Sequence, residues 1–216
     1  MMSYFPEGFL INSKENKLYL SSFENFMRAH FDKTPLEQRV SFCDCDHNLH
    51  IDFGFIHGII PREECAIGIS DGTTRDIAII ARVNKPVRFI IEEIKETPKG
   101  KIAILSRKKV QTDFLENRLS ALSTGDIIDA KVTHLENFGV FCDIGCGINA
   151  LLPIDNISVS RIPHPSARFT PGQKIKAVVR SVDENGRITL SYKELLGTWE
   201  ESAALFRAGE TVPGIV

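Results

Sequence analysis

The sequence contains two copies of one pattern, and this repeat constrains the fold more than any other feature. Three pairs of segments recur in the same order: LHIDFGFIHGIIP and VFCDIGCGINALLP, KPVRFIIEEI and GQKIKAVVRSV, GKIAILSRK and GRITLSYK. The Leu-Ser pairs that begin at Leu105 and Leu190 are 85 residues apart, which gives the approximate period. Each copy is therefore predicted to fold as one structural unit.

Within each copy, short β-rich runs are separated by Gly, Pro, Asn and Asp, and no long helical crossover connects them. This combination is typical of a small antiparallel barrel. The opening segment of the later copy, TGDIIDAKV, is echoed in AGETVPGIV at the end of the chain. The repeat predicts that the chain stops within the first strand of a further copy.

Helices are predicted outside the barrels. Ser22 is placed to cap a helix that carries Phe23, Phe26, Met27 and His30. Between the copies, apolar residues at helical spacing form one stripe: Val110, Phe114, Leu115, Leu119 and Leu122. A similar stripe follows the second copy: Leu195, Leu196, Trp199, Ala203 and Phe206. The predicted order is a helical segment (1–35), a first repeat (36–109), a helical linker (110–122), a second repeat (123–196), and a linker with part of a further repeat (197–216).

The composition is that of an ordinary globular protein. The 216 residues carry 26 Lys and Arg against 28 Asp and Glu, and no segment is a basic tail. No run approaches the roughly 20 apolar residues of a membrane helix, and the first 31 residues lack the features of a signal peptide. These features predict a cytoplasmic protein without a membrane partner.

The five cysteines are predicted to be reduced thiols, because their number is odd and no secretory signal precedes them. The run CDCDHNLH offers Cys43, Cys45, His47 and His50 as metal ligands. In an extended strand, Cys43 and His47 lie roughly 13 Å apart, at about 3.3 Å per residue. Only a sharp turn at 44–48 gathers them around a metal, so no metal and no cofactor are predicted.

The later copy resembles the RNA-binding repeat of the ribosomal protein S1 family. The residues that carry the resemblance are GDIIDAKVTHLENFGVFCDIG, LLPIDNISVSRIPHP and PGQKIKAVVRSVDENGRITLSYKELL. The resemblance implies an OB-fold, a five-stranded Greek-key barrel that binds single-stranded RNA on one sheet face. The fold class is thus mainly β, with tandem five-stranded OB-fold barrels joined by short helices.

Phe138 and Phe141 are the predicted stacking surfaces for RNA bases. Because they are three residues apart, their side chains face opposite sides of an unbroken strand, and one of the two rings is then buried in the core. Alternatively, Gly139 permits a bend that presents both rings together. The FGVF match to the family favours stacking for both.

The resemblance adds further RNA-binding residues. Asp183 and Arg187 match two RNA-contacting positions, Arg187 to pair with phosphate or stack on a base, and Asp183 to accept a hydrogen bond. The alternative is a solvated turn pair. Arg161 and His164 match a loop that borders the same face, and Lys131 is a neighbouring cation. Pro153 stands where the family commonly has His, and the missing ring weakens RNA binding unless such cations compensate.

The earlier copy departs further from the family. His47 and His50 align with the two phenylalanines, and about seven residues are inserted around ISDGTTRD. We interpret it as a degenerate repeat, more structural or protein-binding than RNA-binding. The whole sequence predicts a non-catalytic protein that binds single-stranded RNA, namely mRNA in translation at the small ribosomal subunit. The alternative is a module that docks on a ribosomal or RNA-processing protein with incidental RNA contact.

Overall fold

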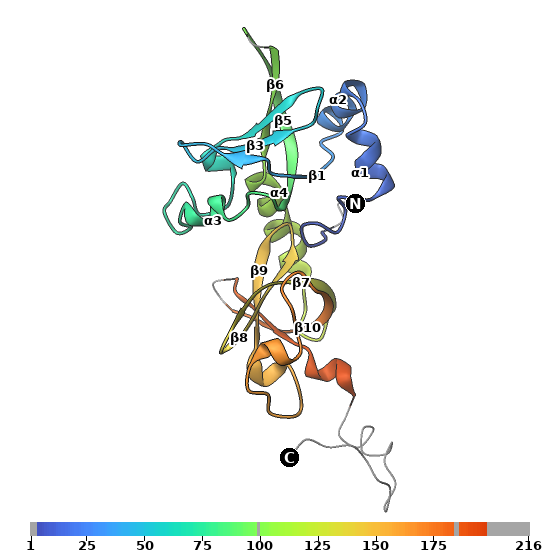
Figure 1. The fold of residues 1–216 in the computed structure, drawn as a ribbon. Helices are drawn as coiled ribbons and strands as arrows, with labels where there is room; N and C mark the ends of the chain where they lie inside the picture. Colours follow the sequence, from blue (N-terminus) through green and yellow to red (C-terminus); the bar gives the residue numbers. More distant parts are fainter. Residues whose placement is uncertain (1–3, 99, 184–185, 198–216) are drawn as a thin grey trace, which may run out of the picture. The chain divides into compact units, whose positions relative to one another are not determined.

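The computed structural model describes residues 4–98, 100–183 and 186–197. The packing of the Cα trace divides the chain into two units, and each contains one β-sheet (Figure 1). Unit 1 consists of Met1–Leu122 with Asp143–Asn149, and unit 2 of Ser123–Cys142 with Ala150–Val216.

The sheet of the later repeat is a closed five-stranded barrel with the order β10-β11-β9-β8-β7. Its strands are β7 (Ile127–Glu136), β8 (Gly139–Gly145), β9 (Ile148–Pro153), β10 (Lys174–Val182) and β11 (Ile188–Ser191). Residues of alternating burial form the strands: in β7, Ile128, Ala130 and Val132 are buried. This period of two places every second side chain in the barrel interior. The prediction of a mainly β, OB-type barrel is confirmed.

The sheet of the earlier repeat has the order β1-β5-β6-β4-β3-β2. Its strands are β1 (Leu36–Arg39), β2 (Phe42–Cys43), β3 (Leu49–Asp52), β4 (His57–Ile60), β5 (Pro86–Thr97) and β6 (Gly100–Ser106). The sixth strand arises because the first strand of the repeat is broken. The Val40 N–H donates to the Lys85 carbonyl, whereas the Ser41 N–H donates to the His50 carbonyl. β1 therefore pairs with β5 and β2 with β3, which keeps the strand order of the barrel in unit 2.

Two further features relate the sheets. The register shifts between Ile91 and Glu93 in the β5/β6 pair and between Val179 and Ser181 in the β10/β11 pair. These β-bulges fall at the same place in each repeat and bend β5 and β10. Each sheet also contains one parallel pair, β4 with β6 and β9 with β11, so the barrel suggested as antiparallel is antiparallel except at this pair.

The N-terminal segment folds into α1 (Lys14–Tyr19) and α2 (Phe23–Phe31). Ser22 caps α2, as predicted, because its hydroxyl accepts a hydrogen bond from the Asn25 N–H at 3.2 Å. Phe26 and Ala29 on this helix are fully buried in the core of unit 1. Short helical turns flank the inserted loop, namely η1 (Arg62–Glu64) and α3 (Ile77–Ile80).

The segment between the repeats is helical but not one regular helix. It consists of α4 (Lys108–Asp113), a π-helical turn, η2 (Phe114–Arg118), and a 3-10 turn, η3 (Leu119–Ala121). Unit 2 adds three 3-10 turns: η4 (Ile154–Asn156), η5 (Pro165–Ala167) and η6 (Lys193–Leu196). The rest of the stripe predicted to follow the second copy, and the strand predicted at 208–216, lie outside the described residues.

A buried ion network ties the N-terminal segment to the end of β6 within unit 1. The Glu7 carboxylate accepts hydrogen bonds from Arg107 Nε at 2.6 Å and Nη2 at 3.1 Å, and Arg82 Nη1 lies 3.3 Å away. Burial by itself raises the pKa of Glu7, but the two guanidinium groups hold it below its usual value. Glu7 is therefore charged and paired.

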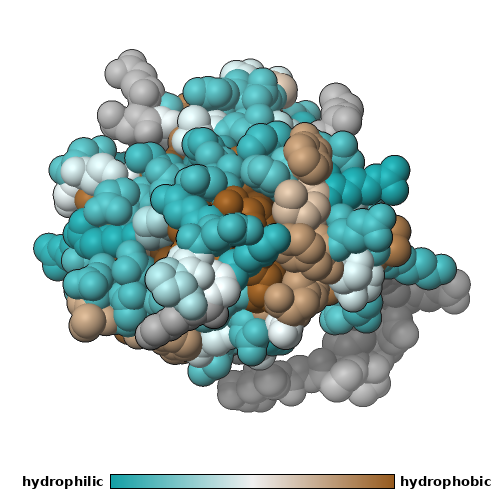
Figure 2. Space-filling view, turned by 90° about the horizontal axis from the view of Figure 1, so that it is seen from above, coloured by the Kyte–Doolittle hydropathy of each residue, from teal (hydrophilic) through white to brown (hydrophobic). Residues whose placement is uncertain are grey.

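Seen from above, the surface is mostly hydrophilic, with apolar side chains gathered in a few places (Figure 2). The exposed large apolar residues of unit 1 are Leu18, Phe31, Phe42, Phe55, Ile77 and Ile80. Within the residues that the structure describes, no helix is long and apolar enough to cross a membrane.

Candidate nucleic-acid interface

Phe138 and Phe141 lie together on the outside of the barrel. Phe138 occupies the turn between β7 and β8 and is 56% exposed, and Phe141 is half-buried on β8. Their ring centroids are 6.0 Å apart with an interplanar angle of 88°. Since Phe138 precedes the strand, the alternation of β8 does not turn the two rings to opposite sides. Of the two alternatives open in the sequence, the geometry is that of two rings presented together.

Gly139 makes this turn possible by close backbone approach. A Cβ atom at Gly139 would lie 2.5 Å from the Leu152 carbonyl oxygen and 3.0 Å from the Pro153 Cα. Real Cβ atoms do not approach backbone this closely, so only glycine lets β8 start against the end of β9. The Phe138 carbonyl then accepts a hydrogen bond from the Ile154 N–H at 2.9 Å, which fixes the turn.

Pro153, where the family commonly has His, is the last residue of β9. It lies against Gly139, at the end of the barrel that carries Phe138. The proline supplies no ring donor to the aromatic pair.

The turn from β10 to β11 carries Asp183 and Arg187. An Asp183 carboxylate oxygen accepts a hydrogen bond from the Arg187 N–H at 2.7 Å, and the Asp183 N–H donates to the Arg187 carbonyl at 3.0 Å. Asp183 thus closes the turn, and both side chains are exposed. Thr189, two residues further on, pairs with Leu151, so β11 lies beside β9 and β9 beside β8. The turn borders the same group of strands as the two rings.

Cations and polar groups lie on the outer sides of β7, which is next to β8, and of β10, which is next to β7. On β7, Lys131 and Thr133 alternate with buried residues and point outward, and the Thr133 hydroxyl donates to the Phe141 carbonyl at 3.0 Å. On β10, Lys176 is exposed and lies 3.1 Å from Asp129, and Arg180 donates to the Asn156 side chain. Thr133 had no signal of its own in the sequence.

Arg161 and His164 belong to the loop between β9 and β10. Arg161 is exposed and lines a pocket of about 540 Å³ with Asp155, Ser158 and Val159. His164 caps η5, because its Nδ1 accepts a hydrogen bond from the Ser166 N–H at 3.1 Å. No measured contact joins either side chain to Phe138 or Phe141 among the described residues, so the loop is a second, separate part of the candidate interface.

In unit 1 the two histidines aligned with the phenylalanines do not form a matching pair. His47 lies in the turn before β3 with a positive φ of 63°, and its Nδ1 is 3.9 Å from Asp76. His50 is half-buried, as Phe141 is in unit 2, and its neighbours on β3, Leu49 and Ile51, are buried. It stacks on Phe42, a residue that the sequence had not singled out.

The sharp turn that a metal site requires does form, since the Asp44 N–H donates to the Asn48 carbonyl at 3.1 Å. The Asp44 carboxylate accepts the N–H groups of Asp46 and Asn48, which stabilises this turn. Across the described part of the chain, no group of three or more His, Cys, Asp or Glu residues is placed to hold a metal ion.

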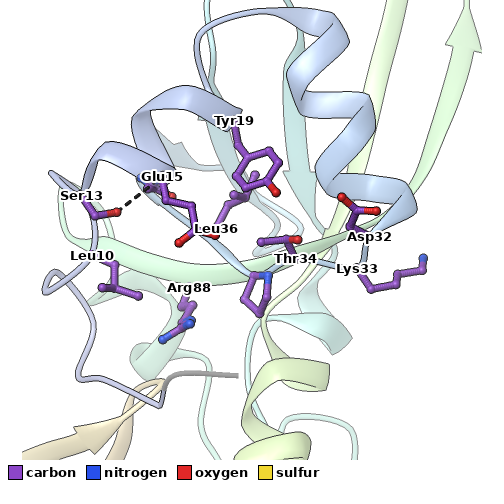
Figure 3. Close-up of a pocket in the computed structure, with 11 residues that line it drawn as sticks. Leu10, Ser13, Glu15, Tyr19, Asp32, Lys33, Thr34, Leu36 and Arg88 are labelled. Carbon is purple, nitrogen blue, oxygen red and sulfur yellow. Dashed lines mark hydrogen bonds between the residues drawn. The ribbon is translucent and has the colours of Figure 1, made fainter. Parts of the chain in front are cut away.

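A pocket of about 350 Å³ lies in unit 1 between the N-terminal helices and the sheet (Figure 3). Its lining includes Tyr19, Lys33, Thr34 and the buried Arg88. Nε and Nη1 of Arg88, and one carboxylate oxygen of the neighbouring buried Glu37, have no hydrogen-bond partner among the described residues. None of the predicted RNA-binding residues lines this pocket.

The model of the S1 RNA binding domain family matches residues 122–193. Over this third of its length the chain is similar to an S1 RNA-binding domain. The barrel with its exposed aromatic pair lies in this domain, so the resemblance recognised in the sequence is confirmed.

The relatives extend the similarity beyond the S1 domain. The chain is 35% identical over 139 residues to small ribosomal subunit protein bS1 of Leuconostoc lactis, covering 62% of this chain and 32% of that protein. It is 39% identical over 119 residues to the bS1 homolog of Bacillus cereus, covering 52% and 31%. The chain thus matches about a third of the length of these curated relatives.

Solved structures also match part of the chain, at low TM-scores. One is the a/eIF2alpha-aDim2p-rRNA complex from Pyrococcus horikoshii, at 25% identity and a TM-score of 0.34 over 39% of this chain and 51% of that chain. Another is GSP13 from Bacillus subtilis, at 22% identity and a TM-score of 0.34 over 43% and 66%. Similarities at this level say nothing about function.

Proposed function

We propose that this protein binds single-stranded RNA without catalysis, through the outer face of the S1 domain. The observation that carries the proposal is the pair of rings at Phe138 and Phe141, held outside a closed barrel in an RNA-binding domain. Stacking of one base on an aromatic ring contributes about 1 to 3 kcal/mol. Two rings that meet edge to face offer surfaces to successive unstacked bases.

The polar residues are assigned roles around these rings. Arg187 and Lys131 neutralise phosphates on either side of the aromatic pair, and Arg161 and His164 contact the strand as it leaves over the β9–β10 loop. Asp183 positions Arg187 by closing its turn and offers its carboxylate to a ribose hydroxyl. With few cations, each domain binds modestly, and linked repeats gain avidity because later contacts become intramolecular.

The RNA that we propose is mRNA, and the setting is translation in the cytoplasm at the small ribosomal subunit. The support is the identity of 33% to 39% with bS1 proteins. The alternative is a module that docks on a ribosomal or RNA-processing protein and touches RNA only incidentally.

Fluorescence anisotropy with a labelled, unstructured oligouridylate tests the proposal. We expect the double variant Phe138→Ala, Arg187→Ala to bind at least about tenfold more weakly, from the loss of one stacked base and one phosphate contact. Phe31→Ala, which removes an exposed ring from α2, serves as the matched control and leaves affinity unchanged. Unchanged affinity in the double variant contradicts the site, and no binding of the intact chain at low salt favours the docking alternative.

A further inference from the structure

Unit 1 carries an exposed stack of rings on the outer side of β2, β3 and β4. The Phe42 and His50 rings are nearly parallel, with centroids 4.3 Å apart and an interplanar angle of 6°, and the His57 centroid is 6.3 Å from Phe42. Phe42 remains 48% exposed. Stacking on His50 covers one side of the phenyl ring, so the exposed area belongs to the rest of it.

Strand register places two carboxylates beside this stack. Phe42 pairs with His50, and Asp52 pairs with His57. Because side chains alternate along β3, Asp52 points outward like His50, whereas Ile51 between them is fully buried. Asp44 lies at the other end, with a carboxylate oxygen 2.9 Å from His50 Nε2. We call Phe42, Asp44, His50, Asp52 and His57 the aromatic–acidic face.

The charge of this region disfavours RNA. Residues 40–61 contain three Asp and three His but no Lys or Arg. The hydrogen bonds from His50 and Asn48 hold the pKa of Asp44 well below its usual value, so its charge persists. Phosphates would meet carboxylates here without cations from these strands.

The matching bulges of the two repeats align β5 with β10. In that register Glu92 stands where unit 2 has Arg180, and Pro86 stands where unit 2 has Lys174. Arg88 stands where unit 2 has the exposed Lys176, but Arg88 is buried. The earlier repeat therefore keeps stacked rings on its outer face but has lost positions that are cationic in the RNA-binding domain.

We propose that the aromatic–acidic face binds an arginine side chain in a basic segment of a protein partner. A guanidinium group stacks on an aromatic ring and pairs with a carboxylate at its edge, which fits the open phenyl ring beside Asp52. Both oxygens of the Asp44 carboxylate already accept hydrogen bonds within the chain, so Asp44 contributes its negative charge. Lysine fits less well, because its ammonium group is a compact charge that does not stack as a plane. The inference goes beyond the RNA-binding proposal and does not depend on it.

The histidines supply a pH-dependent element. With one proton on each ring, His50 Nε2 donates to Asp44, and His57 Nε2 donates to His50 Nδ1 at 2.8 Å. Burial, and then His50, lower the pKa of His57, while Asp52 raises it, so that His57 is neutral at pH 7.5. Further out, His47 faces Asp76, which is paired with Arg62 at 2.7 Å, and Cys43 lies beside Asp44. Acidification therefore adds positive charge next to Phe42.

The test uses the full chain and a fluorescein-labelled peptide of alternating Arg and Gly, with an alternating Lys and Gly peptide for comparison. We expect the Arg peptide to bind about fivefold more tightly than the Lys peptide. Phe42→Ala lowers the affinity for the Arg peptide about fivefold, and Asp52→Asn lowers it about threefold. Phe31→Ala is the matched exposed-ring control and has no effect. Both test side chains are exposed, and unchanged thermal unfolding verifies that the variants fold.

The two surfaces are distinguished in the same experiment. The double variant Phe138→Ala, Arg187→Ala binds oligouridylate more weakly and the Arg peptide as before. The Phe42→Ala variant binds the Arg peptide more weakly and oligouridylate as before. Affinity for the Arg peptide falls as the pH is lowered through the pKa of His57, which lies below the usual value for histidine, because the protonated ring repels guanidinium.

The inference is overturned if the Phe42→Ala variant binds the Arg peptide as tightly as the unchanged protein does. It is also overturned if the chain binds neither peptide at about millimolar concentration. A third contrary result is RNA binding that is weaker in Phe42→Ala and stronger at lower pH. The last result makes this face a second RNA site.

Discussion

At the residue scale, the site depends on a glycine whose importance the sequence shows only in part. The spacing of Phe138 and Phe141 leaves open whether one ring is core, because strand alternation separates residues three apart. Gly139 was the signal for a bend, but the reason for a glycine there, contact with the Leu152 carbonyl, involves a residue on another strand. Long-range backbone contacts of this kind leave no pattern in the sequence.

Gly139→Ala introduces a Cβ 2.5 Å from the Leu152 carbonyl oxygen, so that backbone has to shift. We expect the free energy of unfolding of unit 2 to fall by about 1 to 3 kcal/mol, as for other overpacked sites. Urea denaturation measures it, with Asn137→Ala in the exposed turn as control. Equal stability of Gly139→Ala and Asn137→Ala would show that the turn tolerates a side chain.

At the element scale, the positions of the strands were more predictable than the way in which the strands pair. The period of two in β7 and the repeated closing segments identify the barrel strands, and Ser22 identifies the start of α2. The break of the first strand between Val40 and Ser41 was not predictable, because it is a change of hydrogen-bond partner in a continuous run. The linker stripe predicted a helix, yet only its first turns are α-helical, since tertiary packing overrides weak local preference.

On β1, the buried carboxyl group of Glu37 makes the stability of unit 1 depend on pH. Burial, with the nearby Glu7 charge, raises the pKa of Glu37 to about 7, although Arg88 opposes this. The folded state thus holds a proton that the unfolded state releases near pH 4.5. The free energy of unfolding of unit 1 therefore falls as pH rises from about 5 to 7, by about 1.4 kcal/mol per pH unit from this group.

Glu37→Gln removes this contribution, so its unfolding free energy loses less between pH 5 and 7 than that of the unchanged protein. Urea denaturation at several pH values measures the difference, and Glu15→Gln, an exposed position, keeps the original slope. An identical slope in Glu37→Gln would mean that Glu37 is ionised throughout this range.

At the scale of the whole molecule, the two repeats share a fold and differ in surface chemistry. The overall charge hides this difference, because each repeat is itself close to neutral, with 12 basic and 11 acidic residues in 36–109 and 8 of each in 123–196. The repeats differ in where the charges lie, not in how many there are. The sequence indicated that the first repeat is degenerate. It did not indicate Phe42, whose stacking on His50 depends on pairing between two strands.

The central claim is that RNA lies on the outer face of the S1 domain across Phe138 and Phe141. Chemical-shift mapping of the ¹⁵N-labelled full chain during titration with oligouridylate tests it most directly. We predict saturable shifts of the backbone amides from Phe138 to Phe141 and of Arg187, with little change at Phe42 and His50. Shifts confined to unit 1, or none at 138–141 while RNA is bound, would contradict the account.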